Sequence, residues 1–215
     1  MVDLAAPLDR LLGSTLATHV ARIAGEHGVR IVVEPGGVAL EGGPTPTAVS
    51  IRSGCRLEAD LVVSAVGDTP NVEWLVGSGL PLDGGVVVDE LCRAAEHVVA
   101  AGDVAVKRQP DGTVQRIPSW TNAVEQARSA AQSLLLDDRA SPYRPSHYFW
   151  TELFGLNIKV AGAGRPDGEP DILAGSLAAG SALLAWPDAS APMHVAAFNH
   201  PTPPVRLRRM LRAAP

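Results

Sequence analysis

The chain has 215 residues, 46% hydrophobic and 19% charged, which is typical of a globular protein with one large domain or two small ones. Its net charge of −5 and the absence of a long basic run argue against nucleic-acid binding through phosphates. The sequence contains neither an apolar run of about 18 residues nor a secretory signal, so we expect no membrane span and a cytoplasmic location. One disulfide between Cys55 and Cys92 stays possible, but two reduced thiols are favoured in a reducing compartment.

The first part of the chain is predicted to be an α/β layer. Apolar residues recur at helical spacing from Leu11 to Ile23 and predict a helix that ends near His27-Gly28. The stretches that follow are predicted to be short strands, the middle two in a small antiparallel layer: residues 29–33, 38–40, 49–51 and 57–65. An α/β layer that begins with a helix lacks the strand that should precede it, so we expect the chain to be part of a longer protein.

The middle of the chain continues the α/β pattern. A long helix is predicted over 119–136, and a linker with two prolines over 140–146. Before them we expect, in order, a short helical turn, two strands and a polar hairpin or loop, at residues 74–79, 85–89, 98–104 and 107–116.

The last third has a different, β-rich pattern. A short basic helix is predicted over 206–212, after four strands at residues 156–161, 171–177, 182–186 and 194–198. The predicted fold class is therefore α/β followed by a small α+β C-terminal domain.

Two turns after apolar strands could bind a ligand. In Ala101-Gly102-Asp103, the glycine would allow close approach and the carboxylate could accept hydrogen bonds from a polyol, although a strand-ending turn with a capping Asp is favoured on three residues alone. In Gly67-Asp68-Thr69-Pro70-Asn71, glycine and proline force a turn at the carboxyl edge of a sheet, where α/β proteins bind ligands. A plain turn that closes a domain explains the second segment equally well.

Two tryptophans also have two interpretations each. Trp120 stands at the start of the long helix, whose partly positive N-terminus could seat the electron-rich edge of a flavin. Trp150 ends an aromatic triplet with Tyr148 and Phe149 that could face such a ring. From the residues alone, a capped helix and a core or interface cluster are the favoured interpretations.

Other chemistries are excluded by missing patterns. The six histidines show no metal-ligand spacing, and no Gly-x-Ser-x-Gly is present. No C-x-x-C occurs, which disfavours a disulfide reductase. Gly162 and Gly164 resemble the start of a dinucleotide loop, but Asp167 replaces its last glycine, so no complete G-x-G-x-x-G exists.

Taken in order, these segments resemble one family along essentially the whole chain. The matching segments are residues 2–13, 27–29, 59–63, 67–71, 87–89, 100–104, 120–123 and 148–150. They are similar to the bacterial FAD-dependent ferredoxin reductases of oxygenase systems, of the putidaredoxin reductase and biphenyl dioxygenase reductase type, in their C-terminal portion. The resemblance implies incomplete Rossmann-like remnants: residues 1–65 as the rear of the NAD domain, 66–140 as part of the FAD domain and 141–215 as the C-terminal domain.

The resemblance also implies cofactors, a partner and site residues. NADH would reduce FAD, and the flavin would pass electrons to a [2Fe-2S] ferredoxin. Asp103 would bind the FAD ribitol with Gly102 allowing the approach, and Trp120 and Trp150 would lie near the isoalloxazine ring. Asp3 would bind the adenosine ribose and favour NADH over NADPH.

The sequence departs from the family pattern at several places, and these departures leave two hypotheses about its function. Ile117-Pro118-Ser119 replaces a segment that commonly carries an acidic residue before the tryptophan, and Thr151-Glu152 replaces Ser-Asp. Both glycine fingerprints of the family are missing, and we expect them to be encoded upstream. One hypothesis is therefore a fragment of a reductase, inactive alone; the other is a non-enzymatic remnant or interaction module. Strands without neighbours would also favour self-association.

Overall fold

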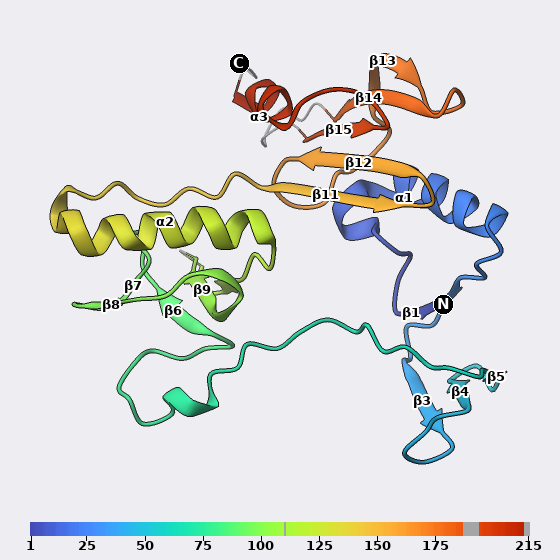
Figure 1. Cartoon of the computed structure of the whole chain (residues 1–215), viewed down its shortest axis with the longest axis horizontal. Helices are drawn as coiled ribbons and strands as arrows, with labels where there is room; N and C mark the ends of the chain where they lie inside the picture. Colours follow the sequence, from blue (N-terminus) through green and yellow to red (C-terminus); the bar gives the residue numbers. More distant parts are fainter. Residues whose placement is uncertain (110, 187–193, 213–215) are drawn as a thin grey trace. The chain divides into compact units, whose positions relative to one another are not determined.

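The computed structural model describes residues 1–109, 111–186 and 194–212, and it is a mixed α/β structure (Figure 1). The chain divides into two compact units. Unit 1 combines residues 1–66 with 150–215, and unit 2 comprises residues 67–149. This grouping joins segments that are far apart in the sequence, and it does not test the predicted division at residues 65 and 140.

Unit 1 is built around a five-stranded sheet in the order β11-β12-β15-β14-β13. Strand β12 pairs antiparallel with β15, β15 with β14, and β14 with β13. Of the three inner strands, β14 and β15 are almost completely buried. The strands are β11 (Tyr148–Leu153), β12 (Leu156–Ala161), β13 (Asp171–Ser176), β14 (Ser181–Trp186) and β15 (His194–Phe198).

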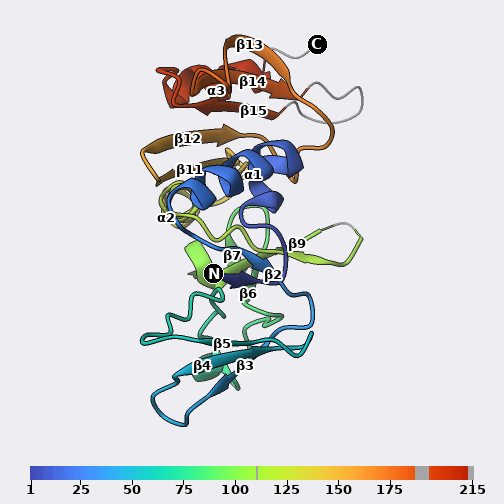
Figure 2. The same ribbon diagram turned by 90° about the vertical axis from the view of Figure 1, so that its right-hand side faces the viewer.

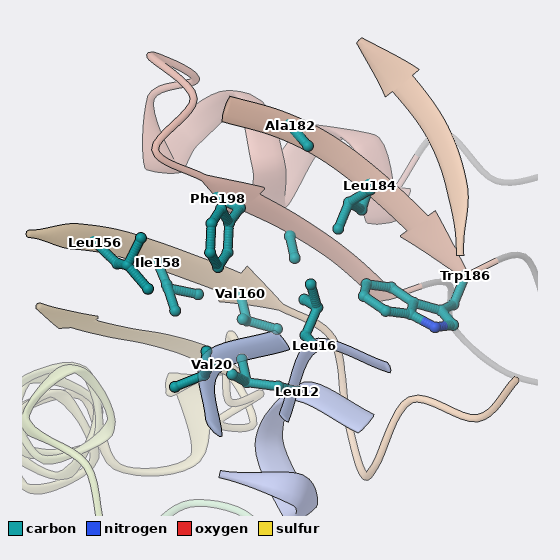
Figure 3. Packing of buried hydrophobic residues seen from close by; sticks show 11 residues of the cluster. Leu12, Leu16, Val20, Leu156, Ile158, Val160, Ala182, Leu184, Trp186 and Phe198 are labelled. Atoms are coloured by element: carbon teal, nitrogen blue, oxygen red, sulfur yellow. The ribbon is translucent and has the colours of Figure 1, made fainter. Parts of the chain in front are cut away.

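The core of unit 1 lies between this sheet and helix α1 (Asp9–Glu26). Leu12, Leu16 and Val20 recur every four residues, so they share one helix face, which points at the sheet (Figure 3). Each fully buried leucine contributes about 1.5–3 kcal/mol relative to an exposed one. Helix α3 (Pro204–Arg212) contacts β12 and β15 and buries Leu207. The sheet residues that face α1 are Leu156, Ile158, Val160, Ala182, Leu184, Trp186, Ala196 and Phe198.

Specific contacts fix the start of α1 against the segment between β12 and β13. Gly13 has φ 71° and interrupts the helix, and a Cβ there would lie 2.7 Å from the Pro166 carbonyl oxygen, so only glycine fits without movement. Arg165 donates to both oxygens of Asp9, from Nε at 2.8 Å and from Nη2 at 3.0 Å. That hydrogen bonding lowers the pKa of Asp9.

The rest of unit 1 consists of short strands. Strands β1 (Val2–Asp3) and β2 (Val32–Val33) pair in parallel. Strand β2 is labelled beside the N-terminus in Figure 2. The predicted antiparallel layer is confirmed, with a third strand added to its edge. It comprises β3 (Val38–Glu41), β4 (Ala48–Ile51) and β5 (Arg56–Glu58), in that order.

The predicted strand over 57–65 is wrong beyond residue 58. After β5, residues 59–72 adopt neither helix nor strand. Leu61, Val63 and Val66 are 77%, 78% and 90% exposed. A strand needs a hydrogen-bonded neighbour, and no strand in the described residues pairs with this segment. Apolar β-branched composition alone is therefore insufficient to form the strand here.

Unit 2 contains a three-stranded sheet in the order β10-β9-β6. Its strands are β6 (Val86–Val88), β9 (Ala105–Arg108) and β10 (Val114–Gln115). Strands β6 and β9 are parallel, and β9 and β10 form the predicted hairpin. A separate antiparallel pair joins β7 (Arg93–Ala95) to β8 (Val98–Val99).

Helical segments complete unit 2. Helix α2 covers Trp120–Leu136, close to the predicted 119–136. The short 3₁₀ turns are η1 (Glu73–Leu75), η2 (Gly102–Val104) and η3 (Asp137–Arg139). Within the described ranges, no helix is long and apolar enough to cross a membrane.

Candidate functional site

The Gly102–Asp103 turn lies directly after β8 and packs against helix α2. Gly102 is buried with φ +78°, and a Cβ there would lie 3.4 Å from the Ala123 Cβ. Its N–H donates to Gln126 Oε1 at 3.0 Å. The positive φ favours glycine here, and the hydrogen bond to Gln126 holds the backbone of this turn against the helix.

A buried hydrogen-bond network supports the turn from the helix side. Gln126 Oε1 also accepts from Asn122 Nδ2 at 3.2 Å, and Asn122 Oδ1 accepts from the Tyr143 hydroxyl at 2.8 Å. Burial raises the pKa of Tyr143 to about 12. The tyrosine is therefore a neutral donor over the whole physiological range, and the segment after α2 is connected to Gly102 through two amide side chains.

Asp103, in contrast, presents its side chain to the surface. The residue is exposed, and its carboxylate makes no hydrogen bond within the described part of the chain. Only its backbone oxygen is engaged, accepting from Arg116 Nη1 at 3.4 Å. A carboxylate at the end of a strand, on a fixed backbone, can accept hydrogen bonds from the hydroxyls of a polyol.

Arg116 links this turn to the Gly67–Asn71 segment. Its guanidinium forms a salt bridge with both carboxylate oxygens of Asp68, Nη2 lying 3.3 Å from Oδ1, and Nη2 also donates to the Asp68 carbonyl oxygen at 3.0 Å. The hydrogen bond with Arg116 lowers the pKa of Asp68, and the same bond raises the pKa of Arg116. Two of the sequence-predicted ligand turns are therefore bonded to one cation.

The start of α2 has the arrangement that the sequence indicates. Ser119 is the N-cap, and its Oγ accepts from the Asn122 N–H at 3.2 Å. Trp120 is the first helical residue and is 74% exposed. The positive end of the helix dipole thus lies beside an exposed indole, an arrangement compatible with an anionic or electron-rich ring.

A cavity within unit 2 is a poor candidate for a large ligand. Its volume is about 40 Å³, room for a few water molecules rather than for a cofactor. Cys92 and Tyr143 line it together with Lys107. Burial raises the pKa of the Cys92 thiol, which makes this cysteine a weak nucleophile. The candidate site is therefore the exposed surface at Asp103.

The other two predicted site residues lie in unit 1. Asp3 ends β1, and its Oδ1 accepts from the Leu4 N–H at 2.7 Å. Trp150 lies in β11 and is 52% exposed. The structure thus brings Gly102 and Asp103 together in one turn and places Trp120 in the same unit, whereas it gives no spatial relation between these residues and the pair in unit 1.

Several site residues were not predicted from the sequence. Arg116 belongs to the polar stretch that was predicted as a hairpin or loop. Asn122 and Gln126 are four residues apart on the predicted helix, a spacing that places them on one face and could have indicated a buried polar pair. No group of three His, Cys, Asp or Glu side chains suited to a metal ion occurs in the residues that the structure describes.

An exposed carboxylate on a turn that follows a strand can bind the hydroxyls of a sugar or polyol. Residues 2–127 match the family model described as Pyridine nucleotide-disulphide oxidoreductase. Because this match covers more than half of the chain, the chain belongs to that family.

Two curated relatives are similar to shorter stretches. The chain is 34% identical to rhodocoxin reductase of Rhodococcus erythropolis over 159 residues. This alignment covers 73% of the chain and 37% of that reductase. Over 139 residues it is 30% identical to the ferredoxin–NAD(+) reductase component of the 3-phenylpropionate/cinnamic acid dioxygenase of Photorhabdus laumondii, covering 64% and 35%. The matches thus span just over a third of the length of these relatives.

Two solved structures show the same fold over a longer stretch. The ferredoxin reductase for the CYP199A2 system from Rhodopseudomonas palustris matches with a TM-score of 0.77 and 28% identity, covering 93% of this chain and 50% of that one. Putidaredoxin reductase, in its covalent complex with putidaredoxin, matches with a TM-score of 0.75 and 26% identity, covering 98% and 51%. The chain is therefore similar to about half of a ferredoxin reductase.

Proposed function

We propose that this chain supplies the ribityl- and flavin-facing contacts of an FAD-dependent oxidoreductase that passes electrons from NADH to a ferredoxin. The observation that carries the proposal is the Gly102–Asp103 turn, in which a rigid backbone presents an exposed carboxylate with no hydrogen bond among the described residues. The names of two relatives, a ferredoxin–NAD(+) reductase component and a ferredoxin reductase, support the choice of electron donor and acceptor.

The residues present fit one end of FAD. Asp103 would accept hydrogen bonds from ribityl hydroxyls, and Gly102, as the resemblance implies, would allow that approach. The N-terminus of α2 would favour negative charge on the flavin ring, with Trp120 beside it. The role of Trp150 near the ring is part of the proposal on the resemblance alone. FAD, when bound, supplies the step between two-electron donation by NADH and single-electron transfer.

The other end of FAD has no equivalent support in this sequence. No G-x-G-x-x-G is present, so a pyrophosphate would lack the backbone N–H groups and the helix dipole that usually hold it. We therefore expect the purified chain to be colourless, to bind FAD weakly and to show little NADH oxidase activity. Asp3 as the NADH-selecting residue, and the three segments 1–65, 66–140 and 141–215 as parts of NAD, FAD and C-terminal domains, belong to the same proposal.

Titration of the full chain with FAD, followed by two-dimensional amide NMR, tests the proposal. We expect the amide signals of Gly102 and Asp103 to shift, and Asp103→Ala to weaken the apparent affinity about tenfold to a hundredfold, as one lost charged hydrogen bond should. Asp111→Ala is the matched control, because Asp111 is an exposed aspartate whose partner, Thr113, lies in its own hairpin.

Each other outcome has a defined meaning. Unchanged affinity in Asp103→Ala would show that Asp103 is only a turn residue. The absence of shifts at Gly102 and Asp103 would favour the non-enzymatic alternative of a remnant or interaction module. A yellow chain that retains stoichiometric FAD would contradict the expectation that the phosphate-binding loops are needed.

A further inference from the structure

The Arg116 side chain forms hydrogen bonds with two segments that are distant from it in the sequence, at Asp68 and at Asp103. It follows β10, and its side chain is 21% exposed. Nη1 donates to Asp68 Oδ2 and, at 3.4 Å, to the Asp103 carbonyl oxygen. Nη2 donates to the Asp68 carbonyl oxygen at 3.0 Å and lies 3.3 Å from Oδ1. One guanidinium thus holds a carboxylate and the backbone of two turns.

The turn that contains Asp68 depends on this arginine. Gly67 has φ +96°, and the segment belongs to no helix or strand. Among the described residues, Arg116 provides the hydrogen bonds that connect Asp68 to a distant part of the sequence. A planar fork of donors suits this task, because it can bind a carboxylate through two nitrogens and still reach a carbonyl, whereas a lysine has a single nitrogen.

We propose that Arg116 is a positioning residue that fastens the Gly67–Asn71 turn to the Gly102–Asp103 turn, so that the two turns form one flavin-facing edge. The function of that edge rests on the FAD-dependent activity proposed above. The fastening itself does not, since it is a contact within unit 2.

The charge of Arg116 adds to its positioning role. Its hydrogen bond with Asp68 raises its pKa, and the nearby Asp103 charge acts in the same direction. The guanidinium therefore stays charged beside Asp103, while Asp103 keeps its carboxylate oxygens available to a ligand. Loss of the arginine would remove both the fork and this charge.

Arg116→Gln in the full chain tests the proposal, with Arg108→Gln as the control. Arg108 is also an arginine of unit 2 that pairs with an aspartate, its Nη2 lying 3.2 Å from Asp83 Oδ2. We expect NMR relaxation to show faster backbone motion at Asp68 and Asp103 in Arg116→Gln only. We expect its FAD affinity to fall about tenfold, and Arg116→Lys, which keeps the charge without the fork, to lie between wild type and Arg116→Gln.

The outcomes separate this inference from the proposed function. If only one turn, or neither, becomes more mobile in Arg116→Gln, Arg116 does not fasten them and the inference is wrong. If both loosen but FAD affinity is unchanged, the positioning role in flavin binding is wrong. If the wild-type chain shows no FAD-induced shifts, the proposed function fails with the flavin-facing part of the inference, and the relaxation data alone still decide the fastening.

Discussion

The substitution Gln126→Leu would test how strongly the Gly102 turn depends on helix α2. Gln126 is 7% exposed, and its Oε1 accepts from the Gly102 N–H at 3.0 Å and from Asn122 Nδ2 at 3.2 Å. Leucine has nearly the same size but no acceptor, so both donors lose their partner in a buried place. The perturbation therefore removes hydrogen bonding while it keeps most of the packing.

The expected loss of stability follows from these two donors. A buried donor left without an acceptor costs about 1–3 kcal/mol. The Gly102 N–H belongs to the backbone and cannot rotate away from the vacated position. The Asn122 side chain loses only the bond from its Nδ2, because its Oδ1 still accepts from the Tyr143 hydroxyl. We therefore expect the free energy of unfolding of unit 2 to fall by about 2 kcal/mol. With an m-value of about 1–1.5 kcal/mol/M for so small a segment, the urea midpoint should fall by roughly 1.5–2 M.

Urea unfolding followed by NMR would measure this effect without interference from unit 1. The amide signals of β6 and β9 report on unit 2 alone. Gln132→Leu is the matched control, since Gln132 is exposed on the same helix and the change there should stay within about 0.5 kcal/mol. Equal midpoints for the two variants would refute the idea that Gln126 supports the turn.

Two further predictions follow from the described residues. Burial raises the pKa of Tyr143 to about 12, above the value of an exposed tyrosine, so the stability that this group contributes is complete below about pH 10 and is lost as the pH rises toward about 12. Tyr143→Phe should lose less stability than wild type between about pH 8 and pH 11 in urea unfolding, and equal losses would contradict this. The exposed apolar side chains of Leu61 and Val63 should make the chain self-associate on heating, and L61S/V63S should reduce light scattering during thermal unfolding. A reversible monomeric transition of the wild-type chain would exclude this.

Much of the local structure could be predicted because local signals were strong. The strands over Leu156–Ala161 and His194–Phe198 begin and end where the apolar pattern and the flanking turns predict. Helix α2 starts one residue after its Ser119 cap. In each case, the residues that determine the element lie within it or next to it.

The features that could not be predicted depend on distant partners. Residues 59–65 have a strand-like composition, but a strand forms only when a neighbour pairs with it. The packing of α1 on the C-terminal sheet was also not predicted, because periodicity identifies the apolar face of a helix and not the surface that covers it. Strand β7 and the first strand of the five-stranded sheet, β11, gave no clear pattern of their own.

In the candidate site too, some features depend on neighbouring residues and others on residues distant in the sequence. From three residues alone, a plain turn with a capping aspartate was favoured at Gly102–Asp103, and the ligand-binding alternative gained weight only from the resemblance along the whole chain. Arg116 and Gln126 act on this turn across 13 and 24 residues of sequence, and nothing in a polar stretch or in a helix indicates which backbone atom such a side chain will reach. The roles of Gly102, Asp103, Trp120, Trp150 and Asp3 toward FAD and NADH stay predictions until the titrations are done.

Unit 1 is formed by two segments that are separated in the sequence by the whole of unit 2, and this order affects folding on the ribosome. Unit 2 is continuous, so it can fold as soon as residue 149 has emerged. Helix α1 is translated before unit 2, yet its apolar face lacks its partners until β15 has been translated. During that interval Leu12, Leu16 and Val20 are without their partners, and the long loop that must close makes the final step slow. The yield of folded chain should therefore depend on the speed of translation after residue 149.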